Sequence, residues 1–201
     1  MIRVGLTGVF GAGKTTVLGF FRKLGARTWD ADAAAHRELA HNKDLQKKIS
    51  RLFGLPGFRG RCRDRRRLAA CVFSDRKKLE QLNALVHPLV KKRLLAYFRK
   101  NRTSSVMIAE IPLLFETDFY KFFHWTVCVA ARTKVRRERV ILKKRCAPQD
   151  IARRARWQLP LSVKIARCDR VIDNNGTRKE TFKQVQTIME EAKWKSSKSQ
   201  S

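Results

Sequence analysis

Short apolar runs alternate along the chain with segments in which apolar residues recur at three- and four-residue intervals. The short runs predict β-strands, and the wider spacing predicts amphipathic helices. The predicted strands cover residues 2–6, 26–29, 106–109, 126–130 and 170–173. The predicted helices cover residues 14–24, 33–39, 45–53, 64–100 and about 180–193. Strands that alternate with helices in this way indicate an α/β fold built on a parallel sheet.

Two segments depart from this regular pattern. Pro88 lies near the centre of the long helical segment 64–100, and we expect it to break the helix, because proline removes a backbone donor and clashes with the preceding turn. Residues 132–167 are strongly basic and are predicted to be mostly helical. The chain after the last helix is expected to fray.

The composition is that of a folded protein with a large excess of positive charge. The 201 residues include 46 Lys and Arg against 17 Asp and Glu, for a formal net charge of +29, and 43% are hydrophobic. That hydrophobic content excludes a disordered basic tail, and the length indicates one compact domain. We find no apolar run of about 18 residues and no signal-peptide pattern, which predicts a soluble, unexported protein. Five scattered cysteines are typical of reduced intracellular thiols, and their spacing predicts no zinc site.

Residues 8–15 carry the pattern G-x-x-x-x-G-K-[ST] between the first predicted strand and the first predicted helix. In that context the pattern indicates a loop for nucleoside triphosphates, the P-loop, because backbone N–H groups and a helix N-terminus surround a phosphate. Lys14 is predicted to reach the outer phosphates, and the Thr15 hydroxyl is predicted to ligate Mg²⁺. The predicted nucleotide-binding residues are Gly11, Ala12, Gly13, Lys14, Thr15 and Thr16.

Two carboxylates, Asp30 and Asp32, follow the second predicted strand. In a parallel sheet ligands gather at the carboxyl ends of the strands, so either carboxylate is placed to accept a proton from an attacking hydroxyl. Asp32 also precedes three alanines and would serve equally well as the N-cap of the next helix. Position alone leaves these two interpretations of Asp32 open.

A series of short motifs resembles, in the same order, the sequence blocks of the dephospho-CoA kinase family. They are GLTG with the rest of the P-loop at residues 5–16, LG at 24–25, DAD at 30–32, AH at 35–36, R-x-x-LA from 65, VF at 72–73, LN at 82–83, HP at 87–88, IPLLFE at 111–116, R-x-x-x-Q from 154 and VIDN-x-G at 171–176. Together they extend over nearly the whole chain, and their combination is far more specific than any one motif.

The resemblance implies a P-loop nucleoside triphosphate hydrolase-like fold of three layers, with a parallel sheet, a helical substrate-binding insertion and a helical lid. In that fold the chain would be a single domain. Its parts would be a nucleotide-binding core of about 1–55, 101–132 and 168–192, a helical substrate-binding subdomain of about 60–100, a basic lid of about 133–167 and a frayed tail of 193–201.

The resemblance also implies an activity: transfer of the ATP γ-phosphate to the ribose 3′-hydroxyl of dephospho-CoA, with Mg²⁺. We expect the protein to be a cytoplasmic monomer with no membrane partner. It favours Asp32 as the catalytic base, with Lys14 and Arg139 as further catalytic residues. The substrate-binding residues that it implies are Asp32, Arg65, His87, Glu110 and Gln158. The lid residues would be Arg139 and Lys143, although either could instead belong to a solvated helix face, the place we assign to Arg136, Arg137, Lys144 and Arg145.

Four residues depart from the family pattern. Ala12 and Thr15 stand at positions where the family usually has serine, and Thr15 is chemically equivalent for Mg²⁺, whereas Val9 and Glu110 bear on the rate. Val9 stands where the family has glycine, near the backbone that approaches the substrate, and Glu110 stands where the family usually has aspartate. The extra methylene of Glu110 would shift its carboxylate by more than an ångström, and errors of that order reduce rates by up to about 10²-fold. Because Lys14, Thr15, Asp32 and Arg139 are intact, we expect an active kinase, and the sequence leaves open whether Val9 and Glu110 reduce its rate.

Two alternatives remain open, a P-loop kinase for another small hydroxyl substrate and a reduced-activity basic family member that binds RNA. Phosphate-bearing substrates account for part of the excess of +29, because a basic cleft attracts them and raises association rates. Many lysines and arginines remain without an assigned partner. Nucleic-acid binding is therefore expected only as a secondary property.

Overall fold

A five-stranded parallel sheet forms the centre of the fold. The computed structural model describes residues 1–142 and 157–198, and its strands are β1 (Ile2–Thr7), β2 (Arg27–Asp30), β3 (Val106–Glu110), β4 (Trp125–Ala130) and β5 (Arg170–Asp173). They lie in the order β2-β3-β1-β4-β5, and every neighbouring pair is parallel. The predicted α/β architecture is thus confirmed.

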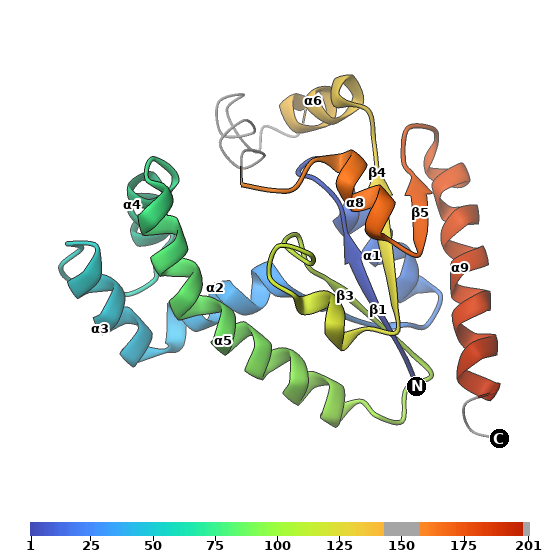
Figure 1. Cartoon of the computed structure of the whole chain (residues 1–201), viewed down its shortest axis with the longest axis horizontal. Helices are drawn as coiled ribbons and strands as arrows, with labels where there is room; N and C mark the ends of the chain where they lie inside the picture. The colour runs from blue at the N-terminus through green and yellow to red at the C-terminus, as the bar shows by residue number, and fades with distance from the viewer. Residues whose placement is uncertain (143–156, 199–201) are drawn as a thin grey trace. The chain divides into compact units, whose positions relative to one another are not determined.

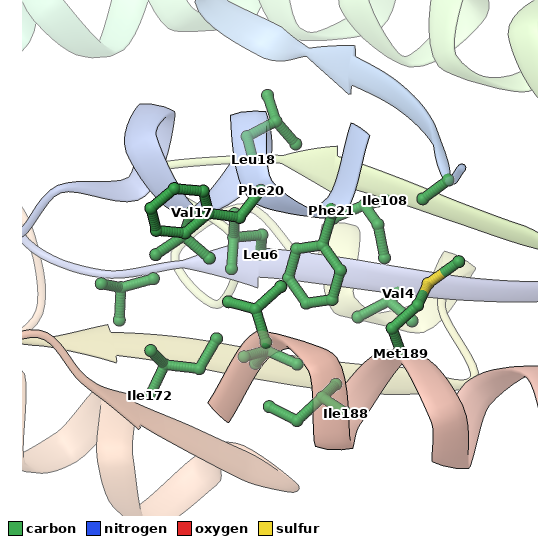
Figure 2. Packing of buried hydrophobic residues seen from close by; sticks show 14 of the residues in the cluster. Val4, Leu6, Val17, Leu18, Phe20, Phe21, Ile108, Ile172, Ile188 and Met189 are labelled. Atoms are coloured by element: carbon green, nitrogen blue, oxygen red, sulfur yellow. The ribbon is translucent and has the colours of Figure 1, made fainter. Parts of the chain in front are cut away.

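One face of the sheet is covered by α1 (Lys14–Lys23) and α9 (Arg178–Lys198) (Figure 1). Their apolar side chains meet those of the strands in the main hydrophobic core. Figure 2 shows Phe21 of α1 close to the strand that carries Leu6 and to Met189 of α9. Burial of this apolar surface is the main stabilising contribution, at about 25 cal/mol for each Å² removed from water.

The opposite face of the sheet contacts α8 (Leu161–Arg167) and residues 111–124, which include the short 3-10 helix η1 (Phe119–Phe122). Gly5 permits this close approach, because an added Cβ there would lie 3.0 Å from the ring of Phe123 and 3.1 Å from Leu114. Helix α6 (Thr133–Leu142) follows β4.

Residues 31–97 form a second compact unit, and the first unit comprises residues 1–30 and the chain from residue 98 onward. The second unit contains α2 (Ala31–His41), α3 (Lys43–Leu52), α4 (Cys62–Phe73) and the greater part of α5 (Arg76–Lys100). Its buried side chains include Leu45 and Ile49 of α3 together with Leu68 and Val72 of α4.

The second unit, which is helical, begins at residue 31. From the sequence we expected a helical subdomain that starts at about residue 60. Hydrogen bonds of Gln46 in α3 account for part of this difference. Its side-chain amide donates to the carbonyl oxygen of Leu39 in α2 at 3.0 Å and to that of Arg59, just before α4, at 3.3 Å. Gly60 lies so close to the same turn that an added Cβ would be 1.9 Å from the Leu39 oxygen. These long-range contacts join α2 and α3 to the helices that follow.

A buried carboxylate, Glu38 of α2, connects α2 with α5. It accepts hydrogen bonds from Arg93 of α5 and from Asn42. Burial raises the pKa of Glu38, but the hydrogen bonds from Asn42 and Arg93, together with the charges of Arg93 and Lys92, outweigh burial, so that the pKa lies below its ordinary value. Glu38 is therefore ionised and paired at neutral pH.

The prediction that Pro88 breaks the long helix is wrong. Pro88 lies inside α5, which runs unbroken from Arg76 to Lys100. Pro88 and Ala84, whose carbonyl loses its helical donor, are both exposed, so water can satisfy that carbonyl. The interruption falls instead at Asp75, whose Oδ1 accepts from the backbone N–H of Lys77 at 2.9 Å and so caps the start of α5.

The terminal helix is also longer than predicted. Helix α9 continues to Lys198, whereas fraying was expected from residue 193. Ala192 and Ser196 are buried, which explains why the last turns stay helical. None of the helices within 1–142 and 157–198 combines the length and apolar character needed to cross a membrane.

Candidate active site

The P-loop connects the carboxyl end of β1 to the first turn of α1. Gly11 and Gly13 have φ values of 80° and 95°, which only glycine adopts readily. At Gly13 the space is also closed, because an added Cβ would lie 2.1 Å from Nδ2 of Asn174. No side chain caps the start of α1, and its first turn holds no acidic residue. The partial positive charge of this helix end is therefore available to an anion.

The side chain of Val9 is 6% exposed and belongs to the hydrophobic core. Its carbonyl oxygen accepts a hydrogen bond from Nζ of Lys14 at 3.4 Å. Lys14 is thereby folded back along the loop that it belongs to. The valine at this glycine position is accommodated because its side chain packs into the core.

Asn174 braces the P-loop from the end of β5, a role that the sequence motif did not reveal. Its Nδ2 donates to the Ala12 carbonyl at 2.7 Å, and its Oδ1 accepts from the Thr181 hydroxyl of α9 at 2.9 Å. The Asn174 carbonyl in turn accepts from Nη1 of Arg139 at 2.7 Å. Asn174 therefore brings Arg139, the predicted catalytic lid residue, beside the P-loop.

Two further side chains hold the tip of the loop at Phe10. The assignment of Arg136 to a solvated helix face is wrong, because its Nη1 donates to the Phe10 carbonyl at 3.2 Å and burial lowers its pKa. Gln158 accepts from the backbone N–H of Phe10 through Oε1 at 3.1 Å. Arg137 is exposed, as expected. The structure thus places Gln158, a predicted substrate residue, against the nucleotide loop.

Carboxylates end two neighbouring strands next to the loop. Asp30 of β2 pairs in register with Glu110 of β3, and Glu110 pairs with Leu6 of β1. Glu110 is 6% exposed. The carboxyl edge of the sheet therefore brings these two acidic side chains to the strand that leads into the P-loop.

Asp32 is the second residue of α2 and lies in its first turn. The helix begins at Ala31, directly after Asp30, so Asp32 does not occupy the N-cap position that the sequence left open for it. An acidic residue there is still favourable for the helix, because it faces the partial positive charge of the helix start.

Lys164 of α8 is a fully buried cation on the face of the sheet opposite α1 and α9. Its Nζ lies 2.8 Å from Oε1 of Glu116 and 2.8 Å from the Pro112 carbonyl that accepts its hydrogen bond. Glu116 also accepts from the backbone N–H of Leu159 at 2.8 Å. We did not predict a role for Lys164 from the sequence. The weak signal for its burial is that it lies between the apolar residues Val163 and Ile165.

The other predicted residues belong to the helical unit or to undescribed parts of the chain. Arg65 donates through Nη1 to the Gly60 carbonyl at 2.8 Å. His87 lies in α5, and burial lowers its pKa. Lys143 lies outside the described residues, as do Lys144 and Arg145.

The arrangement in the first unit suits a nucleotide phosphate and a divalent cation. The glycine loop, the uncapped helix start and Lys14 are all placed to bind phosphate oxygens. Thr15 is exposed in the first turn of α1 and Thr16 is half-buried beside it. A hydroxyl oxygen supplemented by phosphate oxygens and water is a donor set that suits Mg²⁺, so Thr15 fits the predicted metal ligand.

Comparison with known proteins gives a consistent result. A family model described as dephospho-CoA kinase matches residues 2–180. The dephospho-CoA kinase of Aquifex aeolicus is 35% identical over 193 residues, which cover 95% of this chain and 97% of that protein. The dephospho-CoA kinase of Geobacillus kaustophilus is 34% identical over 196 residues, which cover 94% of this chain and 96% of that protein.

Solved structures agree with this likeness. TT1252 from Thermus thermophilus is 34% identical, with a TM-score of 0.81 over 94% of this chain and 97% of that one. The dephospho-CoA kinase from Campylobacter jejuni is 19% identical and shares the fold, with a TM-score of 0.62 over 94% of this chain and 96% of that one.

Proposed function

We propose that this chain, which belongs to the dephospho-CoA kinase family, transfers the γ-phosphate of ATP to the ribose 3′-hydroxyl of dephospho-CoA with Asp32 as the base. The products are coenzyme A and ADP. The observation that carries the proposal is the intact P-loop, which is braced at the carboxyl edge of the sheet with Lys14 in it and Arg139 beside it.

Phosphoryl transfer depends on alignment of the reacting groups and on neutralisation of phosphate charge. The P-loop backbone and Lys14 would hold the outer phosphates of ATP. Arg139 would place its guanidinium against the transferred phosphoryl group, since its contact with Asn174 already holds it near Gly13. The ion Mg²⁺, which Thr15 would hold, supplies charge neutralisation between the phosphates when bound.

Asp32 is proposed as the group that accepts the proton of the attacking hydroxyl. It follows Asp30, the last residue of β2, by two positions, and its place inside α2 leaves the N-cap role to another residue. A carboxylate that hydrogen-bonds to a hydroxyl can orient it for in-line attack and take its proton as the new P–O bond forms. Arg65, His87, Glu110 and Gln158 remain the residues proposed to contact dephospho-CoA.

The test is a direct assay of the purified chain with ATP, Mg²⁺ and dephospho-CoA, in which 3′-phosphorylated product is expected. Asp32→Asn should reduce kcat by two to four orders of magnitude and leave ATP binding nearly unchanged, since general-base catalysis contributes about 10²–10⁴-fold. Asp44→Asn is the matched control, because Asp44 is an exposed acidic residue in the first turn of α3. Equal activity of the two variants would exclude Asp32 as the base.

A panel of hydroxyl substrates separates the proposal from a kinase of different specificity. Preference for a nucleoside without the pantetheine arm would refute dephospho-CoA as the substrate.

We propose that the enzyme works as a cytoplasmic monomer. Five scattered cysteines without a C-x-x-C pair are typical of a reducing compartment.

A further inference from the structure

A group of basic and aromatic side chains lies at the amino edge of the sheet, where β1, β4 and β5 begin. We define the amino-edge surface as Arg3, His124, Trp125, Arg170, Trp194, Lys195 and Lys198. Figure 1 shows the N-terminus and the last turns of α9 at this end of the sheet, away from α6. The six residues of β1 span about 20 Å between this edge and the P-loop. The amino-edge surface is thus remote from the phosphate site.

Each of its two tryptophans carries a cation over the ring. Lys195 Nζ lies 4.4 Å from the centre of the Trp125 ring, and Arg170 Cζ lies 5.6 Å from the same centre. Lys198 Nζ lies 4.2 Å from the ring centre of Trp194. Trp125 is buried, but Trp194 is 58% exposed. An apolar ring of this size, open to water and flanked by cations, has no role in the core.

Positive charge converges on this edge. Arg3 Nη2 lies 3.3 Å from Nε2 of His124. Burial lowers the pKa of His124, and Arg3, the N-terminal amino group and Lys195 lower it further. Glu191 partly offsets this charge through its ion pair with Arg170 at 3.1 Å. Residues 192–198, however, contain three lysines and no acidic residue. Basic side chains therefore outnumber the described carboxylates at this edge, which are those of Glu191 and of Asp169, the acceptor of the Thr126 N–H.

We propose that the amino-edge surface binds single-stranded RNA without sequence preference. Proteins that bind single strands in this way combine cations along the phosphate backbone with aromatic rings on which bases stack. The cations of this surface supply the first element and the exposed indole of Trp194 supplies the second. The proposal also gives a use to part of the net charge of +29 that ATP and dephospho-CoA leave unexplained.

One observation and one requirement of stacking favour this occupant over a membrane and over a duplex. A membrane-binding helix presents a broad apolar stripe, whereas Trp194 is the one large apolar side chain exposed on the described length of α9. Stacking on an indole requires a base that is not already stacked in a duplex. Unpaired bases are characteristic of RNA loops and ends.

The binding test uses the full chain and a fluorescein-labelled 15-nucleotide oligo(U), with anisotropy measured at several salt concentrations. Trp194→Ala should weaken binding about fivefold or more, because it removes a stacking platform. The double change Lys195→Gln and Lys198→Gln should reduce the slope of log K against log salt by about 1.4, at 0.7 for each lost phosphate contact. All variants should keep wild-type kinase activity, which verifies that they fold.

Matched controls separate this surface from general charge. Tyr120→Ala removes another exposed aromatic ring, with Lys121 Nζ 5.8 Å from its centre, but there Asp118 pairs with the lysine. Lys77→Gln with Lys78→Gln removes two exposed charges from α5. Both controls should bind oligo(U) as the wild type does.

Three results would overturn the proposal. The first is unchanged binding in Trp194→Ala, and the second is an equal loss in the control variants. The third is tighter, Trp194-dependent binding to phosphatidylserine vesicles or to duplex RNA than to the single strand.

Discussion

The buried ion pair between Lys164 and Glu116 gives the sharpest stability prediction. The side chain of Lys164 is 0% exposed and that of Glu116 is 15% exposed. The pair holds α8 against the Pro112 carbonyl and, through the Leu159 N–H, holds the chain that enters α8. Glu116→Gln keeps the shape and the acceptor for Leu159, but it leaves the Lys164 ammonium buried among neutral oxygens.

Removing one partner of a buried pair costs about 3–5 kcal/mol, because an uncompensated charge remains out of water. Glu116→Gln retains one hydrogen bond to Lys164, so we expect a loss near the lower limit, about 3 kcal/mol. A loss of this size is a large part of the 5–15 kcal/mol that stabilises a typical native protein. Lys164→Met removes the cation and leaves a carboxylate that water can partly reach, so its cost should be smaller.

The double variant should lose less than the sum of the single variants, by roughly 1–3 kcal/mol, because no buried charge remains unpaired. The assay is urea unfolding followed by circular dichroism. The control is Glu80→Gln, which breaks the Arg76–Glu80 pair on α5, where the side chains are 77% and 60% exposed, and it should change stability by less than about 1 kcal/mol. Equal losses of stability in Glu116→Gln and in this control, or additive losses in the two single variants, would refute a cost from an unpaired buried charge.

Alanine at two glycines should have opposite effects on thermal unfolding. Gly13→Ala would place a methyl 2.1 Å from Asn174 at a φ of 95° and should lower Tm and weaken ATP binding. Gly19→Ala, in the middle of α1, would meet nothing within 4 Å apart from its own helix backbone and chain neighbours, and it should stabilise by about 0.5–1 kcal/mol. A rise in Tm for Gly13→Ala would contradict this. Because the pKa of Glu38 lies below its ordinary value near 4.5, its contribution to stability is complete above that pH and is lost as pH falls through the lowered pKa. Glu38→Gln should therefore flatten the stability profile in that acidic range, and an unchanged profile would refute the ionised pair.

The sequence by itself was sufficient to predict the parallel strands, the P-loop motif and the family, but not the order of the strands in the sheet. Buried parallel strands are short apolar runs, and the loop motif requires glycine, lysine and threonine at fixed spacing, so local sequence carries this information. The strand predictions differ from the structure by at most one residue at each end. The long helix showed the limit of local rules, since Pro88 is tolerated on an exposed surface while Asp75 starts α5.

Only the tertiary structure decided which distant side chains hold the site together. Asn174 contacts Ala12, and Arg136 and Gln158 contact Phe10, across more than a hundred positions of the chain. Periodicity does not encode such pairs, because they depend on how strands align and helices pack. The same packing places the side chain of Val9 in the core and buries Lys164 beside Glu116. Sequence determined the chemistry of the P-loop, and packing determined which residues position it.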